Sequence, residues 1–179
     1  KFLFMSSNVK NIGFIGTGII GFPMAKNLIK SNYPTYAFIR NARKAKNLEK
    51  IGCKVINELE NFYHKIDILI LAVSDTKDVK DILVGKNGLI KFKYRPNIVI
   101  DMSTICPIET ISLSKKLSKH KISLVDAPVS GGETGAIKGS LSIMLGGEKN
   151  IVKKVMPIMK VLGEKITHVG KSGAGQVAK

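Results

Sequence analysis

NIGFIGTGIIGFPMAKNL, residues 11–28, is the most informative segment of the chain. An apolar run leads into Gly16, and residues typical of a helix follow Gly21. The spacing of Gly16, Gly18 and Gly21 is that of a dinucleotide-binding turn. The first glycine permits a tight turn, the second lets the backbone approach a pyrophosphate, and the third allows close helix packing. The following helix would offer its N-terminal N–H groups to the phosphates. We therefore expect a cofactor to be bound by Gly16, Thr17, Gly18, Ile19, Ile20 and Gly21.

Short β-branched runs alternate with helical stretches along the rest of the chain. The expected strands are Asn11–Ile15, Thr35–Ile39, Ile66–Val73, Asn97–Asp101, Ile122–Asp126, Ser140–Leu145 and Lys165–Val169. The expected helices are Phe22–Ser31, Arg43–Ile51, Leu59–His64, Lys77–Leu83, Pro107–His120 and Lys149–Leu162. Such alternation predicts a Rossmann-type, doubly wound α/β domain over residues 10–179, with a mainly parallel sheet covered by helices. The last two strands are expected to extend the sheet in antiparallel fashion.

The charge composition bears on whether the protein binds nucleic acid. The chain has 29 basic and 13 acidic residues, a net charge of +16. The lysines are spread along the chain with no dense block, which argues against a nucleic-acid partner and favours scattered solvent-facing charge. A non-catalytic nucleotide sensor or nucleic-acid binder remains the alternative that this charge supports.

Membrane and metal partners are not expected. The longest apolar run, Ile68 to Val73, is far below the roughly 20 residues of a membrane span. Two cysteines, Cys53 and Cys106, and three histidines match no metal-ligand spacing. We expect a cytoplasmic protein, with a mitochondrial or other organellar location as the alternative if a targeting segment precedes these residues.

The end of the second expected strand bears on the choice of cofactor. NAD binding usually uses an acidic residue about 20 positions after the glycines, to hold the ribose 2′-hydroxyl. Residues 36–46 contain no acid, and Arg40 and Asn41 occupy this place. Arginine can pair with a 2′-phosphate, so the sequence favours NADP, with NAD as the alternative. A basic loop that is merely exposed to solvent and binds no phosphate would have the same sequence pattern.

Five segments together resemble the 3-hydroxyisobutyrate dehydrogenase, or β-hydroxyacid dehydrogenase, family. They are the glycine turn with its tail GFPMAKNL (residues 21–28), VSDTKDV (73–79), DMSTICP (101–107), DAPVSGGETGAIKGSL (126–141) and GAGQVAK (173–179). The resemblance runs from about Asn11 to the last residue. The fourth segment is the most specific, whereas glycine turns are common elsewhere.

The resemblance implies roles for individual residues. It implies that Val73 and Lys77 lie at the pyrophosphate side of the cofactor and that Thr104 contacts the nicotinamide half. The structural alternative for Thr104 is that it caps the following helix. Ser130, Gly131 and Gly132 would hold a substrate carboxylate, although a Gly-Gly pair by itself is more often just a turn. Lys179, in the first turn of a long helix, would perform acid–base catalysis.

The implied activity is hydride transfer between NADP(H) and a small β-hydroxyacid or semialdehyde acid of the 3-hydroxyisobutyrate, glyoxylate or succinic semialdehyde type. A 6-phosphogluconate dehydrogenase-like enzyme is the alternative. Family members continue with an all-helical second domain that these 179 residues do not contain. We therefore expect the fragment alone to bind cofactor weakly and to catalyse little, and the full-length form to be a homo-oligomer.

Overall fold

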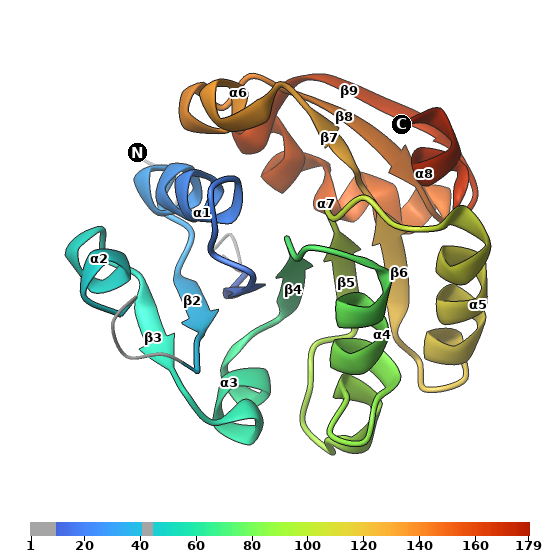
Figure 1. Ribbon diagram of the computed structural model, residues 1–179, viewed down its shortest axis with the longest axis horizontal. Helices are drawn as coiled ribbons and strands as arrows, with labels where there is room; N and C mark the ends of the chain where they lie inside the picture. The colour runs from blue at the N-terminus through green and yellow to red at the C-terminus, as the bar shows by residue number, and fades with distance from the viewer. Residues whose placement is uncertain (1–9, 41–44) are drawn as a thin grey trace, which may run out of the picture.

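The computed structural model describes residues 10–40 and 45–179 (Figure 1). The strands are β1 (Ile12–Ile15), β2 (Thr35–Phe38), β3 (Lys54–Ile56), β4 (Ile68–Leu71), β5 (Ile98–Asp101), β6 (Ser123–Asp126), β7 (Val129–Ser130), β8 (Leu141–Gly146) and β9 (Gly163–Gly170). The helices are α1 (Gly21–Lys30), α2 (Ala45–Lys50), α3 (Leu59–Lys65), α4 (Thr76–Val84), α5 (Pro107–Ser118), α6 (Gly132–Lys138), α7 (Lys149–Leu162) and α8 (Ala174–Ala178), with a 3₁₀ turn at Leu89–Lys91.

The strands form one mainly parallel sheet in the order β3-β2-β1-β4-β5-β6-β8-β7, and β9 pairs with β8. The six strands from β3 to β6 in this order run parallel to one another. The β8 strand is antiparallel to β6 and β7, and β9 is parallel to β8. The expected Rossmann-type fold is confirmed, and β8 and β9 both run against the parallel strands.

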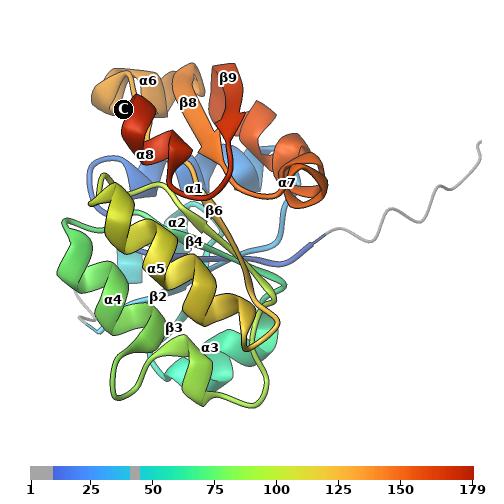
Figure 2. The same cartoon turned by 90° about the vertical axis from the view of Figure 1, so that its right-hand side faces the viewer.

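Helices cover both faces of the sheet (Figure 2). Side chains alternate between the faces along each strand, as strand geometry requires. In β4, Ile68 and Ile70 pack into a core that includes residues of α1, α6 and α7. Leu69 and Leu71 point the other way, into a core shared with α3, α4 and α5. Burying each such side chain contributes about 1.5–3 kcal/mol, so these two cores hold the helices against the sheet.

The order of the strands places a ligand-binding crevice beside β1. The chain leaves β1 for β2 on one side and later returns to β4 on the other side of β1. In open α/β sheets, ligands bind outside the carboxyl ends of the strands at this point of reversal. Gly16 directly follows β1, while Ala72 and Val73 follow β4.

Besides the 3₁₀ turn, three described elements were not expected from the sequence. The β3 strand has only three residues, β7 has two, and α6 begins at Gly132 among several glycines. The expected helix start at Arg43 lies outside the described residues. Among residues 10–40 and 45–179, no helix combines the length and apolar character needed to cross a bilayer.

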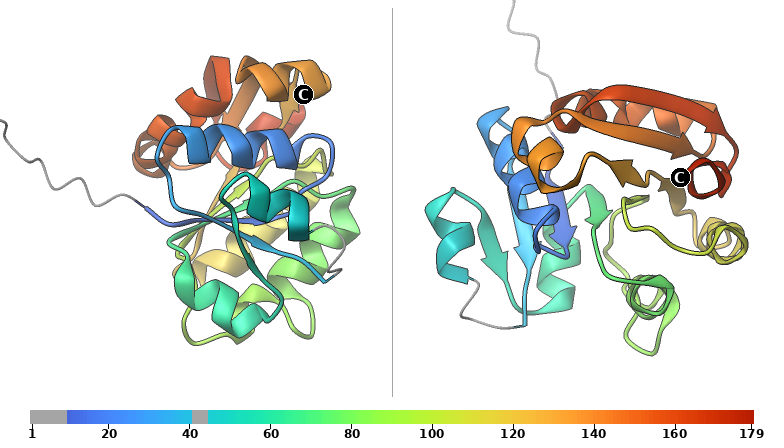
Figure 3. Two further views of the ribbon diagram at one scale, coloured as in Figure 1. Left: turned by 90° about the vertical axis from the view of Figure 1, so that its left-hand side faces the viewer. Right: turned by 45° about the horizontal axis from the view of Figure 1, so that its top comes forward.

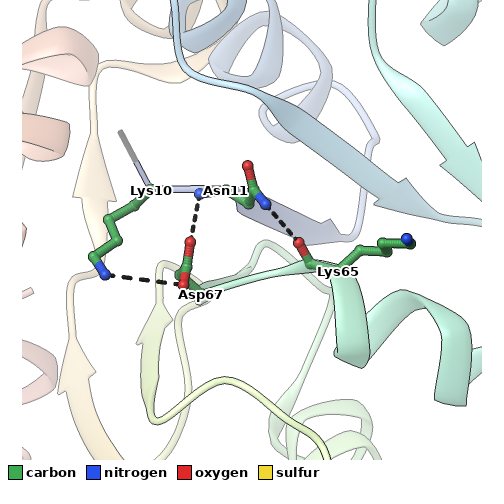
Figure 4. Close-up of polar contacts among 4 residues, drawn as sticks. All are labelled: Lys10, Asn11, Lys65 and Asp67. Atoms are coloured by element: carbon green, nitrogen blue, oxygen red, sulfur yellow. Dashed lines mark hydrogen bonds and ion pairs between the residues drawn. The ribbon is translucent and has the colours of Figure 1, made fainter. Parts of the chain in front are cut away.

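The amino ends of β1 and β4 are tied together by polar contacts (Figure 4). The Asn11 N–H donates to Asp67 Oδ2 at 2.8 Å, and Asn11 Nδ2 donates to the Lys65 carbonyl oxygen at 2.9 Å. Lys10 Nζ lies 3.9 Å from Asp67 Oδ1, with both side chains about half exposed. Such an exposed ion pair contributes little, so the two hydrogen bonds fix this edge of the sheet.

Candidate functional site

The glycine turn joins β1 to α1, and its three glycines differ in what surrounds them. Gly16 has φ +97°, and a Cβ there would lie 2.1 Å from the Ala72 carbonyl oxygen. A Cβ on Gly21 would lie 1.9 Å from the Gly16 carbonyl oxygen. A Cβ on Gly18 would meet nothing within 4 Å. The fold itself therefore requires glycine at Gly16 and Gly21, whereas Gly18 leaves open space where a ligand can approach the backbone.

The start of α1 suits an anion. No side chain caps the helix at Ile20, and its first turn holds no acidic residue. The N-terminal N–H groups of a helix carry a partial positive charge that favours phosphate. Gly18 and Ile19 are exposed directly before this helix. The turn therefore fits the pyrophosphate of a dinucleotide.

A cleft of about 1280 Å³ lies at the carboxyl ends of β1, β2 and β4. Four of the predicted cofactor residues line it: Gly16, Thr17, Arg40 and Val73. Lys77 does not line it, since the residues that α4 contributes are Asp78, Asp81 and Ile82. Lys77 is exposed in the first turn of α4. Asn41 lies outside the described residues.

The cleft also contains carboxylates that the sequence reasoning missed. Glu58 and Glu60 line it together with Arg40. Glu58 follows β3, and β3 pairs with β2, so Glu58 lies at the same edge of the sheet as Arg40. The Glu58 carboxylate accepts a hydrogen bond from Asn61. The signal was missed because β3 itself was not expected, although an acid soon after a short β-branched run was visible in the sequence.

The loop after β5 is bound to the loop after β4. The Val73 N–H donates to Ser103 Oγ at 3.0 Å, and the Ser103 N–H donates to Asp101 Oδ1 at 3.0 Å. Thr104 is exposed on this loop. The first residue of α5 is Pro107, and Cys106 occupies the cap position without a side-chain bond. Neither Ser103 nor Thr104 is therefore a cap of α5.

The Ser130-Gly131-Gly132 segment links β7 to α6 and is exposed to solvent. Gly131 has φ +128° and Gly132 has φ +57°, and a Cβ on Gly132 would meet nothing within 4 Å. Side chains are rarely compatible with such backbone angles, so glycine is required at both positions. The segment presents an accessible backbone and the Ser130 hydroxyl. It does not line the cleft.

Lys179 follows the five-residue helix α8 and is exposed. Its backbone N–H donates to the Gly175 carbonyl oxygen at 3.2 Å, so the lysine continues the helical hydrogen-bonding pattern. As expected, glycines precede the helix, and Gly173 has φ +92°. Figure 3 shows α8 at the end of β8 and β9, next to α5.

Asp126 and Gln176 hold α8 in place, and the sequence reasoning assigned neither of them a role. The buried Asp126 carboxylate accepts from the Gly173 N–H at 2.7 Å and from the Gln176 N–H at 3.1 Å. A Cβ on Gly146 would lie 2.5 Å from this carboxylate, and one on Gly175 would lie 2.8 Å from it. The residues that these bonds join are 47 and 50 positions apart, so no local pattern could reveal them.

A second buried carboxylate, Asp101, lies opposite Asp126 in the register of β5 and β6. Burial raises the pKa of Asp101 from 3.8 to about 7; the negative charge of Asp126 adds to this shift, and hydrogen bonds with Ser103 oppose it. Within the described part of the chain, Asp101 Oδ2 has no hydrogen-bond partner. Two neighbouring acids thus lie beneath the loop that carries Thr104.

Known proteins resemble this chain over nearly its whole length. Residues 11–170 match the model of the NAD-binding domain of 6-phosphogluconate dehydrogenase. The chain is 38% identical over 168 residues to 2-hydroxy-3-oxopropionate reductase of Escherichia coli, covering 94% of this chain and 57% of that protein. It is 33% identical over 175 residues to 2-(hydroxymethyl)glutarate dehydrogenase of Eubacterium barkeri, covering 98% of this chain and 58% of that protein.

The fold also matches a solved structure, that of 3-hydroxyisobutyrate dehydrogenase of Mycobacterium tuberculosis with L-serine. The TM-score is 0.87 at 28% identity, covering 95% of this chain and 57% of that one. The chain thus spans less than two thirds of the length of these relatives. The chain belongs to the family defined by the NAD-binding domain of 6-phosphogluconate dehydrogenase and, within it, to the β-hydroxyacid dehydrogenases.

Proposed function

We propose that the protein transfers a hydride between NADP(H) and a small β-hydroxyacid or semialdehyde acid, with Lys179 as its acid–base residue. The main support for this proposal is the arrangement of α8. Asp126 and Gln176 tie the helix before Lys179 to the carboxyl ends of β5 and β6. The glycine turn and Val73 lie at the same edge of the same sheet. In this proposal, residues 10–179 are the dinucleotide-binding domain and α8 leads toward a second domain that completes the site.

Each group of residues has a separate task. The turn from Gly16 to Gly21 would hold the pyrophosphate, with Val73 and Lys77 nearby and Thr104 at the nicotinamide half. Ser130, Gly131 and Gly132 would hold the substrate carboxylate. A bound nicotinamide dinucleotide supplies or accepts the hydride. The Lys179 ammonium would donate a proton to the carbonyl oxygen in reduction, and neutral Lys179 would take the hydroxyl proton in oxidation.

Substitution of Lys179 in the full-length protein tests this assignment. We expect Lys179→Ala to lower kcat by at least about 100-fold, the lower end of general acid–base contributions, while the Kd for cofactor stays within about twofold. Lys171→Ala is the matched control, because Lys171 is also an exposed lysine, close to α8. Turnover that survives in Lys179→Ala would remove the lysine from the mechanism.

Arg40 supports NADP as the preferred cofactor. It is exposed in the cleft, at the end of β2 where an acid would serve NAD. Glu58 and Glu60 in the same cleft oppose the binding of a 2′-phosphate, so the preference is expected to be modest.

A substrate screen with both nicotinamide cofactors separates the remaining candidates. Glyoxylate, succinic semialdehyde, methylmalonate semialdehyde and tartronate semialdehyde are supplied with NADPH or NADH for reduction, whereas 6-phosphogluconate, a hydroxyacid that can only be oxidised, is supplied with NADP+ or NAD+. The last is included because the matching family model is that of the NAD-binding domain of 6-phosphogluconate dehydrogenase. Turnover of a small acid with no turnover of 6-phosphogluconate is the expected result.

A further inference from the structure

Gln176 lies three residues before Lys179, and only 7% of its surface is exposed. Its side-chain Oε1 accepts from the Ile105 N–H at 3.1 Å, and its Nε2 donates to the Ser103 carbonyl oxygen at 2.8 Å. The two bonds bracket Thr104. A donor on one side and an acceptor on the other fix the orientation of the amide, since a flipped amide would present the wrong atom to both partners.

The loop that Gln176 holds is itself bound to its surroundings. Ser103 Oγ accepts from the Val73 N–H at 3.0 Å, and the Cys106 N–H donates to Thr76 Oγ1 at 3.2 Å. Hydrogen bonds therefore run from the loop after β4, through the loop after β5, to α8. All of them join residues at least 30 positions apart in the chain.

The helix that carries Lys179 depends on such contacts. A five-residue helix is far too short to be stable alone in water. Asp126 fixes its first N–H groups, and the Gln176 side chain fixes its position relative to the Thr104 loop. The two anchors use different atoms: Asp126 accepts from the backbone N–H groups of Gly173 and Gln176, whereas the Gln176 side chain bonds to the Thr104 loop.

Building on the proposed function, we propose that Gln176 is a positioning residue, whose paired hydrogen bonds to Ser103 and Ile105 hold Lys179 and Thr104 in one rigid unit. Gln176 is buried behind the loop and acts through its neighbours. Loss of the pair leaves cofactor binding at the glycine turn intact but lets Lys179 move relative to the reacting carbonyl. A misplacement of about 1 Å can cost roughly 100-fold in rate.

The decisive variants are Gln176→Glu and Gln176→Ala in the full-length protein. Glutamate has nearly the shape of glutamine, but its ionised form places an oxygen against the Ser103 carbonyl oxygen. When protonated, it again donates to that oxygen, and burial makes protonation accessible near neutral pH. Alanine cannot restore the bond at any pH.

We expect both variants to lose roughly 10- to 100-fold in kcat at about pH 8, with cofactor Kd values within about twofold of the parent. On lowering the pH to about 6, Gln176→Glu should recover several-fold relative to the parent, and Gln176→Ala should not. Rates are divided by the concentration of cofactor-binding sites, so unfolded protein does not contribute. Asn11→Ala is the control: it removes a side-chain amide bond to a backbone carbonyl at the opposite edge of the sheet and should leave kcat unchanged.

Hydrogen exchange separates this inference from the proposed function. Faster exchange at the Ile105 amide in Gln176→Ala, with parental exchange in Lys179→Ala, supports the positioning role even if Lys179→Ala keeps its turnover. Parental kcat in both Gln176 variants, or an equal loss at both pH values in Gln176→Glu and Gln176→Ala, would overturn it.

Discussion

Replacing Gly18 with alanine separates the ligand-binding role of the glycine turn from its structural role. The added methyl group meets no atom within 4 Å, and Gly18 is not among the glycines with positive φ. Stability should therefore stay equal or rise by about 0.4–1 kcal/mol, because alanine restricts the unfolded chain. If a pyrophosphate lies against this backbone, the methyl group removes a charge-assisted hydrogen bond of about 1.5–3 kcal/mol. That loss corresponds to roughly 10- to 150-fold in the cofactor Kd.

Two measurements on the same protein test this reasoning: urea unfolding, and titration with NADPH followed by fluorescence. Gly21→Ala is the matched control, because its methyl group would lie 1.9 Å from the Gly16 carbonyl oxygen. That variant should lose about 1–3 kcal/mol of unfolding free energy or more. Parental affinity in Gly18→Ala would show that the pyrophosphate does not approach this residue. An equal loss of stability in both variants would refute the packing argument.

Two further predictions concern charge in the site. Arg40→Ala should weaken NADPH binding about tenfold, the lower end for a charge-assisted hydrogen bond, while NADH binding changes less than about twofold; equal losses in paired titrations would reject Arg40 as a 2′-phosphate ligand. Asp101→Asn concerns the carboxyl whose pKa burial raises from 3.8 to about 7. The raised pKa of Asp101 stabilises the fold below the unfolded pKa of 3.8, and this stabilisation is lost as the pH rises through about 7. It amounts to at most about 4 kcal/mol, at 1.36 kcal/mol per pKa unit. Urea unfolding across this range should therefore show a flatter pH dependence in Asp101→Asn than in the parent, and parallel curves would contradict this prediction.

The fold could be predicted where local pattern and tertiary packing agree. The β4 strand is a continuous apolar run because both of its faces are buried, and α5 begins at a proline whose missing N–H does no harm there. The misses are segments whose structure depends on neighbours. The β3 strand is three residues at the edge of the sheet, and the glycines of α6 look like a loop until β8 packs beside them.

The candidate site also has parts that the sequence predicts and parts that only the fold reveals. The glycine turn is a local signal, and its geometry follows from its spacing. Arg40 could be identified from the sequence as a candidate cofactor residue. The presence of the acidic Glu58 beside it could not, because only the pairing of β2 with β3 brings the carboxyl ends of these two strands together. The Gln176 bonds join residues 71 and 73 positions apart, and no spacing rule covers such a distance. Sequence patterns therefore indicate which residues are candidates for the chemistry, and the fold is needed to find what holds them.

Because the start of β1 is anchored, the beginning of the chain is the better point for immobilising the protein on a sensor surface. Asn11 and Asp67 fasten the amino ends of β1 and β4, whereas Gly16 and Val73 lie beyond their carboxyl ends. A four-residue strand spans about 13 Å, so the two edges are well separated. A biosensor linkage before Lys10 would enter the fold at the edge away from the cleft and leave it free for titration. A linkage after Lys179 would instead pull on α8, whose hold on the Thr104 loop is a single buried side-chain amide.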